Sequence, residues 1–445
     1  MSETVIIGAT SDSSEIPELD ISEHIEYIRH NLESLIMLPG CGQESLSDLT
    51  VINQLRADFP NLKQVGIICS WFINGTDISS ATIKPGTENA QNSSEWKVGN
   101  YTTENAHQIS ICETNGEKIV NFGGTVSDDK LLAWVNKAKE LGLEIAFYPM
   151  LLVDNPEKAW RGYITGNAED VVKFYKEQYK PFITHYLELL GDKVKIFYIG
   201  SELEGLTSIK DEQNQFPFVD KLISLAKKVK NALQKSEVSY AANWTEYHSC
   251  HGGLRPLDNL WSHPAIDFVG INYYMPLTNS QEQDLHNVET IKRGFESGEG
   301  WDYYLSNECL EPFSDHSYAW KDLAFWYYNQ HFEPGNGNPT NWIPESKDIK
   351  LSEFGIRSLD RATDAPYLYG KDVPKNSNGK VDNIIQILAI EAFLRHIKEK
   401  EFIVGGYYYG YDSRGKDWDK KYFDGNEYAR GHGLDRKIGI NKEST

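Results

Sequence analysis

The sequence is poor in cysteine and has no long hydrophobic segment. Its five cysteines are odd in number and scattered, and no two form a CxxC pair, which argues against a disulfide framework. The first twenty residues lack a basic stretch followed by an apolar core, so we predict no signal peptide. The longest apolar runs, VGIICSWFI and IAFYPMLLV, are far shorter than a membrane span. We therefore expect no membrane partner.

Basic residues are also scarce, because 44 Lys and Arg stand against 65 Asp and Glu for a net charge of −21. This balance argues against nucleic acid, which needs a basic face. P-loop, GxSxG and Gly-rich dinucleotide motifs are missing, so we expect no cofactor. His248, Cys250 and His251 in EYHSCHGG match no standard zinc spacing. A polar loop is the simpler interpretation of this segment, and we expect no metal.

Aromatic residues, in contrast, are plentiful. The chain contains 25 Tyr, 18 Phe and 11 Trp, which together make up 12% of its residues. Such a load suits stacking on carbohydrate, and it equally suits the filling of a large core. Composition alone leaves both interpretations open.

The order of elements predicts an α/β fold, a (β/α)8 TIM barrel with long βα loops. The first 44 residues are polar and are expected to form an arm or cap, and the barrel domain is expected to cover residues 45–440. Near-continuous apolar runs, typical of parallel strands covered on both faces, alternate with helical patterns, and eight strands in such alternation indicate a closed barrel. The expected strands are 64–72, 118–125, 143–153, 193–202, 238–247, 266–277, 349–355 and 402–412.

Two glutamates stand at the carboxyl ends of expected strands that face each other across the barrel. Glu202 ends the fourth strand in YIGSE, and Glu353 ends the seventh in IKLSEFG. Two opposed carboxyl groups, one protonated and one ionised, are what cleavage of a glycosidic bond requires. The alternative is that both glutamates pair with Arg or Lys in a structural network. Glu204 lies in the following turn and is expected at the rim or behind the site.

Other polar and aromatic residues at strand ends are candidates for substrate binding, because chemistry in such barrels sits at the carboxyl ends of the strands. Trp71 and Trp244 could stack on sugar rings or could belong to the core, whereas Trp261 is expected to be packing. Asp412 follows the eighth strand and either lines the mouth or caps that strand. The substrate-binding candidates are Trp71, Ser201, Asn243, Trp244, Glu246, Asn272, Tyr273 and Tyr409.

The segments YIGSELEGLTSI, YAANWTEYH, LDNLWSHPAIDFVGINYYMPL and IKLSEFG resemble the TIM-barrel-like domain of gene transfer agent and phage tail hub proteins. So do FGGTVSDDKLLAWVNKAKELGLEIAFYPMLLVD and the closing DGNEYARGHGLDRKIG, and the resemblance runs from about residue 45 to about residue 440. That family is similar to glycoside hydrolases with catalytic glutamates after strands four and seven.

This resemblance implies roles for individual residues. It implies that Glu202 is the general acid/base and Glu353 the nucleophile. Ser201 stands where the related hydrolases have Asn, and Tyr273 or Tyr274 would bond to the nucleophile. Tyr407 and Tyr409 hold the place of a Trp platform after strand eight.

Two hypotheses follow from these observations. The first is a retaining glycoside hydrolase that cleaves a polysaccharide, with peptidoglycan glycan strands as the first candidate. The second is a catalytically silent barrel that binds glycan or forms part of a phage-tail or gene transfer agent assembly, with tail proteins as partners. Without a signal peptide, we expect a protein that is cytoplasmic or associated with a phage particle.

Overall fold

The structure is a computed structural model of the 445-residue chain, and it describes residues 20–37, 50–88, 95–114, 117–120, 122–298, 303–304, 312–313, 319–368 and 372–411. Its centre is a closed barrel of eight parallel strands. The barrel strands are β1 (Ser34–Met37), β2 (Gln64–Ile73), β10 (Glu144–Val153), β11 (Ile196–Ser201), β12 (Glu237–Asn243), β13 (Val269–Asn272), β16 (Ile349–Phe354) and β17 (Ile403–Tyr411).

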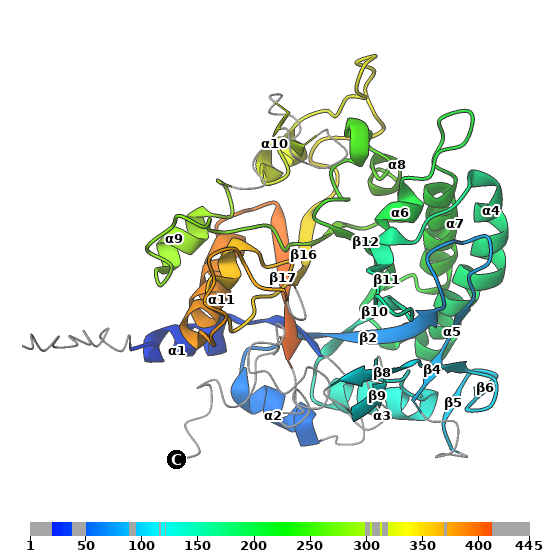
Figure 1. The fold of residues 1–445 in the computed structure, drawn as a ribbon, viewed down its shortest axis with the longest axis horizontal. Helices are drawn as coiled ribbons and strands as arrows, with labels where there is room; N and C mark the ends of the chain where they lie inside the picture. Colours follow the sequence, from blue (N-terminus) through cyan, green and yellow to red (C-terminus); the bar gives the residue numbers. More distant parts are fainter. Residues whose placement is uncertain are drawn as a thin grey trace, which may run out of the picture.

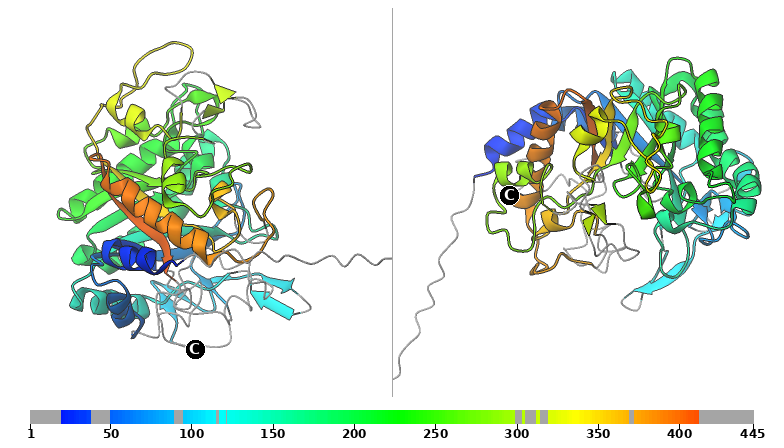
Figure 2. Two further views of the ribbon diagram at one scale, coloured as in Figure 1. Left: turned by 90° about the vertical axis from the view of Figure 1, so that its left-hand side faces the viewer. Right: turned by 90° about the horizontal axis from the view of Figure 1, so that it is seen from above.

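Strand β1 closes the barrel, because it pairs with β2 on one side and with β17 on the other. The arm expected over residues 1–44 therefore contains the first barrel strand. Conversely, the expected barrel strand at 118–125 is wrong: Glu117–Val120 is β9, which pairs antiparallel with β8 (Ile111–Thr114). This hairpin projects from the body of the molecule (Figure 2). Strand β1 escaped prediction because SLIM is only four residues long.

Helices surround the barrel, with α4, α5 and α7 on one side and α9 and α11 on the other (Figure 1). A π-helical turn at Tyr175–Tyr179 joins α4 to α5, and Pro181 lies in the first turn of α5, where no backbone N–H is required. The helices are α1 (Ser22–Asn31), α2 (Thr50–Asp58), α3 (Asp128–Glu140), α4 (Ala168–Phe174), α5 (Lys180–Leu190), α6 (Glu204–Thr207), α7 (Pro217–Ala232), α8 (Asp258–Trp261), α9 (Val288–Arg293), α10 (Leu323–Tyr328) and α11 (Asn383–Lys398).

Short antiparallel and parallel pairs decorate the βα loops. They are β3 (Ile83–Lys84), β4 (Gly86–Thr87), β5 (Lys97–Val98), β6 (Tyr101–Thr102), β7 (His107–Gln108), β14 (Tyr303–Tyr304) and β15 (Pro312–Phe313). Most of them lie in the long β2–α3 connection, so the expectation of long βα loops is met there. Within the described residues, no helix is both long enough and apolar enough to cross a membrane.

Apolar side chains on both faces of the strands hold the barrel together. One large cluster fills the space between strands and helices, and burial of this area is the main stabilising contribution to the fold. A second cluster draws on most of the strands and fills the barrel interior; it contains Ile36, Ile68, Ala146, Tyr148, Met150, Ile196, Tyr198, Ala241, Phe268 and Tyr407. The barrel interior is thus packed below its mouth.

Candidate active site

A cavity of about 500 Å³ lies at the carboxyl ends of the barrel strands. Its wall is formed by the ends of β10, β16 and β17, by the residues that directly follow β11, β12 and β13, and by the loop after β10. Both Glu202 and Glu353 line this cavity. The structure therefore brings together the two carboxyl groups that the sequence predicts at strand ends four and seven.

Glu202 is held by three hydrogen-bond donors. Trp160 donates from Nε1 to its Oε2 over 2.8 Å, and Arg161 Nη2 forms an ion pair with the same oxygen at 2.8 Å. Asn272 donates from Nδ2 to Oε1 over 2.7 Å. Because an indole, a guanidinium and this amide nitrogen can only donate, the arrangement suits an ionised carboxylate and offers no acceptor for a carboxyl proton.

The backbone at Glu202 adopts a left-handed conformation, with φ of +51°. A residue other than glycine rarely adopts this region, and strain of this kind is often found at functional sites. The conformation turns the chain sharply between β11 and α6. It thereby points the Glu202 carboxyl group into the cavity, where the three donors meet it.

Gly205 allows the loop after β10 to approach this turn. A Cβ atom at Gly205 would lie 2.5 Å from the carbonyl oxygen of Ile164 and 2.7 Å from that of Gly162, both on that loop. Such contacts are too short for any side chain. The absence of a Cβ atom therefore lets Trp160 and Arg161 come within hydrogen-bond distance of Glu202.

Asn272, at the end of β13, connects the two halves of the site. Its Oδ1 accepts hydrogen bonds from Tyr148 and Ser352, both at 2.8 Å, which leaves Nδ2 free to face Glu202. Asn272 is also the register partner of Glu353 in the sheet. The predicted residue Asn272 thus fixes the position of Glu202 from below, and it does not line the cavity.

Glu353 has a much less polar environment than Glu202. Its Oε2 accepts one hydrogen bond, from the Tyr274 hydroxyl at 2.7 Å, and its buried Oε1 has no partner within hydrogen-bond distance among the described residues. Burial raises the pKa of Glu353 to about 7, and the charge of Glu202 adds to this rise. Arg161 and the hydroxyls of Tyr148 and Tyr274 oppose it without cancelling it.

The two carboxyl groups therefore differ in their surroundings. Glu202 is surrounded by donors, including Arg161, whose own pKa is raised by the charges of Glu202 and Glu353 although burial alone would lower it. Glu353 holds its proton up to about neutral pH. Different environments for two neighbouring carboxyl groups are the arrangement on which acid–base pairs depend.

Three of the predicted substrate-binding residues line the cavity: Asn243, Trp244 and Tyr409. The Trp244 ring lies 5.9 Å from the ring of Tyr367, another residue of the cavity wall, and 5.4 Å from that of Trp320. Together, Trp244 and Tyr367 form an aromatic surface of the kind on which sugar rings stack. Tyr407 lies lower in the barrel, where it donates to Gln64 at 2.7 Å.

The structure places two predicted aromatic residues away from the cavity. Trp71 is buried on the helical side of β2, and its Nε1 donates to the Tyr186 hydroxyl of α5 over 3.0 Å. Tyr273 donates to the carbonyl of Phe295 over 3.0 Å and packs against that ring. The side chains of Trp71 and Tyr273 therefore both point outward from the barrel. The next residue along the chain from Tyr273, Tyr274, lines the cavity instead.

Ser201 is also buried outside the cavity wall. Its hydroxyl donates to Tyr148 over 3.2 Å and accepts from Arg161 Nη2 over 3.3 Å, while its carbonyl accepts from Arg161 Nε over 3.1 Å. The pairing of β11 with β12 is irregular between Tyr198 and Ser201, and this irregularity changes which side chains face inward. Ser201 therefore positions Arg161 and Tyr148.

Glu246 is buried behind the wall and is not exposed to the cavity. It accepts hydrogen bonds from Thr207 at 2.7 Å and Tyr240 at 2.8 Å, and burial raises its pKa to about 8. Glu204 lies nearby and accepts from Thr245 at 2.6 Å; burial raises its pKa to about 7. Since Thr245 lines the cavity and Glu204 does not, Glu204 stands behind the site.

Trp261, His248 and Cys250 are not among the residues that line the cavity. Trp261 is fully buried, as expected for a packing residue. His248 forms a hydrogen bond with Ser249 at 2.8 Å, and Cys250 is buried. The side chain of His251, and Asp412, lie outside the described residues; among those described, no group of three or more His, Cys, Asp and Glu could hold a metal ion.

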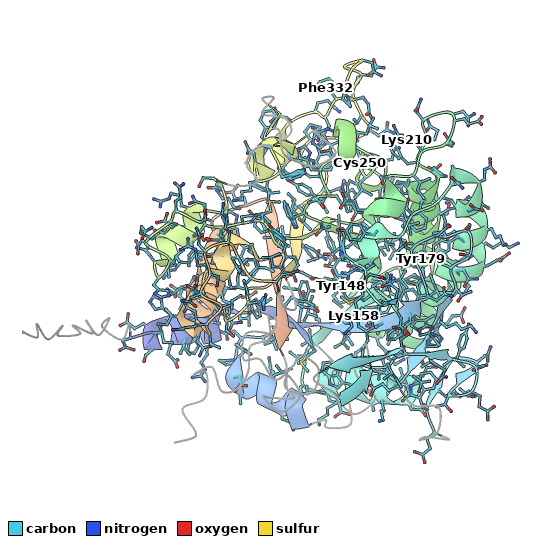
Figure 3. All side chains as sticks on the ribbon, in the orientation of Figure 1. Tyr148, Lys158, Tyr179, Lys210, Cys250 and Phe332 are labelled. Carbon is cyan, nitrogen blue, oxygen red and sulfur yellow. The ribbon has the colours of Figure 1, made fainter. Side chains whose placement is uncertain are left out.

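Sequence reasoning missed Trp160, Arg161, Tyr148 and Lys158. Lys158, Trp160 and Arg161 come from the loop after β10, and Tyr148 comes from β10 itself. Tyr148 and Lys158 are labelled in Figure 3. No motif marks KAWRGY, but a Trp and an Arg in the loop that follows a strand are a usable signal for the mouth of a barrel.

The closed eight-stranded parallel barrel, with a pair of carboxyl groups at its mouth, is a (β/α)8 TIM barrel. The sequence profile described as "GTA TIM-barrel-like domain" matches residues 177–410, just over half of the chain. The chain therefore belongs to the family of gene transfer agent TIM-barrel-like domains, and the resemblance inferred from the sequence is confirmed.

Solved structures with the same barrel include glycoside hydrolases. A complex of a GH113 β-1,4-mannanase is similar with a TM-score of 0.50 at 13% identity, over 91% of this chain and 94% of that one. The GH113 β-mannanase of Alicyclobacillus acidocaldarius, in complex with ManMIm, also has a TM-score of 0.50 at 13% identity, over 88% and 91%. At such low identity, this likeness shows a shared fold. No curated protein matches the chain in sequence.

Proposed function

We propose that this protein is a retaining glycoside hydrolase that cleaves a polysaccharide with Glu202 and Glu353. The observation that carries the proposal is a pair of buried carboxyl groups that line the same cavity. Glu202 accepts from three donors, and Glu353 has a raised pKa. One ionised and one protonated carboxyl group are the two reactants that the protein must supply for glycosidic cleavage.

The environments favour a distribution of roles opposite to the one that the resemblance implies. Glu353 keeps its proton up to about neutral pH, and among the described residues its Oε1 has no hydrogen-bond partner, so it would protonate the leaving oxygen. Glu202, whose oxygens accept from Arg161 and Asn272, would attack the anomeric carbon as a carboxylate, forming a glycosyl ester. The Glu353 carboxylate would then take a proton from water, whose oxygen displaces Glu202 from the sugar.

A polysaccharide is the expected substrate because the cavity is open and carries the aromatic surface of Trp244 and Tyr367. Peptidoglycan glycan strands are the first substrate to test, given the family to which the chain belongs. The likeness to GH113 mannanases makes β-1,4-mannan the second.

The test measures reducing ends released from peptidoglycan glycan strands, mannan and a panel of aryl glycosides. We expect turnover by the wild type and a loss of at least a thousandfold in Glu202→Gln and Glu353→Gln. The exposed Glu157 supplies the matched control variant, Glu157→Gln, which should retain full activity. If the wild type releases no reducing ends from any of these substrates, the hydrolase proposal fails.

Azide distinguishes the two distributions of roles. When the nucleophile is replaced by alanine, azide attacks directly and gives a glycosyl azide of inverted configuration; when the acid/base is replaced, the azide product retains its configuration. We expect inversion with Glu202→Ala and retention with Glu353→Ala, read by NMR of the product from an activated aryl glycoside. The reverse pattern would restore the roles that the resemblance implies.

One observation favours a second candidate function, a catalytically silent barrel that binds glycan within a tail or gene transfer agent assembly. The ion pair of Glu202 with Arg161 is the structural network considered as an alternative from the sequence. On this hypothesis, glycan binding by the wild type and by Glu353→Gln would be equal, and neither protein would release reducing ends.

A further inference from the structure

Among the described residues, one cation of the cavity wall forms no ion pair with a carboxylate. Among the described residues of the cavity wall, the basic side chains are Lys158 and Arg161. Arg161 is neutralised by its 2.8 Å ion pair with Glu202. No ion pair of Lys158 with an Asp or Glu occurs among the described residues, where its Nζ instead lies over the Phe122 ring, although the chain as a whole is strongly acidic. The half-buried Lys158 ammonium is therefore available to a ligand.

A tight and well-anchored turn holds Lys158 in place. Its backbone N–H donates to the carbonyl of Asn155 over 3.0 Å, with φ of +48°. Asn155 Oδ1 accepts from the Ala159 N–H at 2.9 Å. At the base of the turn, the buried Asp154 binds His107 at 2.6 Å and the Ser110 N–H at 2.8 Å.

The side chain of Lys158 lies against an apolar part of the wall. Its Nζ is 5.4 Å from the centroid of the Phe122 ring, a distance at which a cation is attracted to an aromatic face. Neighbouring wall residues include Leu152, Val153 and Ala159. Apolar surroundings strengthen the attraction between an ammonium and an anion, and a lysine that is already held loses less side-chain entropy on binding.

We propose that Lys158 forms an anion subsite and that the glycan bound in this cavity carries a carboxylate. The inference rests on the proposed function, because it specifies the substrate class of the same site. An acidic glycan would be repelled by the net charge of −21. A positive group on the cavity wall offsets that repulsion, whereas a neutral glycan has no group that would pair with it.

The test compares carboxylated glycans with their own carboxyl-reduced forms. The probes are muramate-containing peptidoglycan glycan strands, oligogalacturonate and hyaluronan oligosaccharides, each before and after reduction of its carboxyl groups. Binding is measured by calorimetry in full-length Glu353→Gln protein, so that no turnover interferes. Lys158→Met removes the charge and keeps the apolar stem, Lys158→Arg keeps the charge, and Lys173→Met on the exposed face of α4 is the control for net charge.

We expect at least one acidic glycan to bind about tenfold more tightly than its reduced form at low salt, with the preference shrinking as salt is added. Lys158→Met should abolish the preference without weakening the neutral form, and the other two variants should retain it. Equal binding of both forms, or an equal loss of both in Lys158→Met, would overturn the inference.

The outcomes separate this inference from the proposed hydrolase. Lys158-dependent binding of an acidic glycan that the wild type does not cleave supports the anion subsite and refutes the hydrolase. If the wild type cleaves both the acidic and the reduced glycans, and the two forms bind with equal affinity, the hydrolase is supported and the anion subsite is refuted. Failure to bind any of the probes refutes the inference outright.

Discussion

Replacement of Glu353 by glutamine is predicted to stabilise the protein at alkaline pH. The pKa of Glu353 rises from an ordinary value of 4.5 to about 7, chiefly because the group is buried. At 1.36 kcal/mol per pKa unit, ionisation of Glu353 lowers the free energy of unfolding by about 3 kcal/mol. Glutamine never ionises, and its side-chain oxygen can still accept the hydrogen bond of Tyr274.

The sign of the effect follows from proton binding. An acid with a raised pKa in the folded state binds more protons folded than unfolded between pH 4.5 and about 7. The contribution of Glu353 to stability is therefore intact below pH 4.5 and declines as the pH rises to about 7. The difference in unfolding free energy between Glu353→Gln and wild type should rise by about 3 kcal/mol over this interval and then level off.

Urea denaturation at 25 °C, followed by fluorescence at pH 4.5, 6, 7 and 8.5, gives this difference, since other titrating groups cancel between the two proteins. The exposed Glu157→Gln variant is the control and should follow the wild type at each pH. A difference that stays constant from pH 4.5 to 8.5, or that falls, would refute the reasoning that Glu353 is buried and protonated.

Three further predictions concern neighbouring groups. Glu246→Gln replaces a buried acid with a pKa of about 8. In the same urea assay, it should stabilise the protein by on the order of 4 kcal/mol at pH 9 relative to pH 4.5. A difference that does not change with pH would contradict the raised pKa of Glu246. Tyr274→Phe removes the hydroxyl that favours ionised Glu353, so the pKa of Glu353 should rise and the alkaline limb of the pH–rate profile should move to higher pH. The value of kcat/KM should fall about tenfold or more. An alkaline limb that stays at the same pH would contradict the contact between Tyr274 and Glu353. Gly205→Ala should lower the unfolding free energy by about 1–3 kcal/mol, because its Cβ would meet a carbonyl oxygen at 2.5 Å. Gly75→Ala, with no atom within 4 Å, is the control, and equal effects of the two would argue against the close approach.

The barrel could be predicted from sequence because its strands are buried on both faces and read as apolar runs. Two errors in the strand count cancelled. The run at 118–125 was counted although it forms one strand of a hairpin, and β1 was missed because four apolar residues carry too little signal. Both errors precede β10, so Glu202 and Glu353 kept their places after strands four and seven.

The direction of individual side chains was harder to predict than their place at strand ends. Tyr273 was expected among the substrate-binding residues, and either Tyr273 or Tyr274 was expected to contact Glu353; Tyr274 makes that contact and lines the cavity. Side chains alternate along β13 and just beyond it, so Ile271 and Tyr273 face the outer core, whereas Asn272 and Tyr274 face inward. The Trp160 and Arg161 contacts could not be predicted, because they depend on how closely a loop approaches Gly205.

The contrast between the two carboxyl groups also bears on the choice between a structural network and a chemical site. A structural network would be expected to satisfy both groups, yet Arg161 pairs with Glu202, while the buried Oε1 of Glu353 has no hydrogen-bond partner among the described residues. An uncharged side chain at 353 would avoid the loss of about 3 kcal/mol on ionisation. Packing and stability therefore do not account for a glutamate at this position, whereas a proton donor to a bound substrate requires one with a raised pKa and a free oxygen.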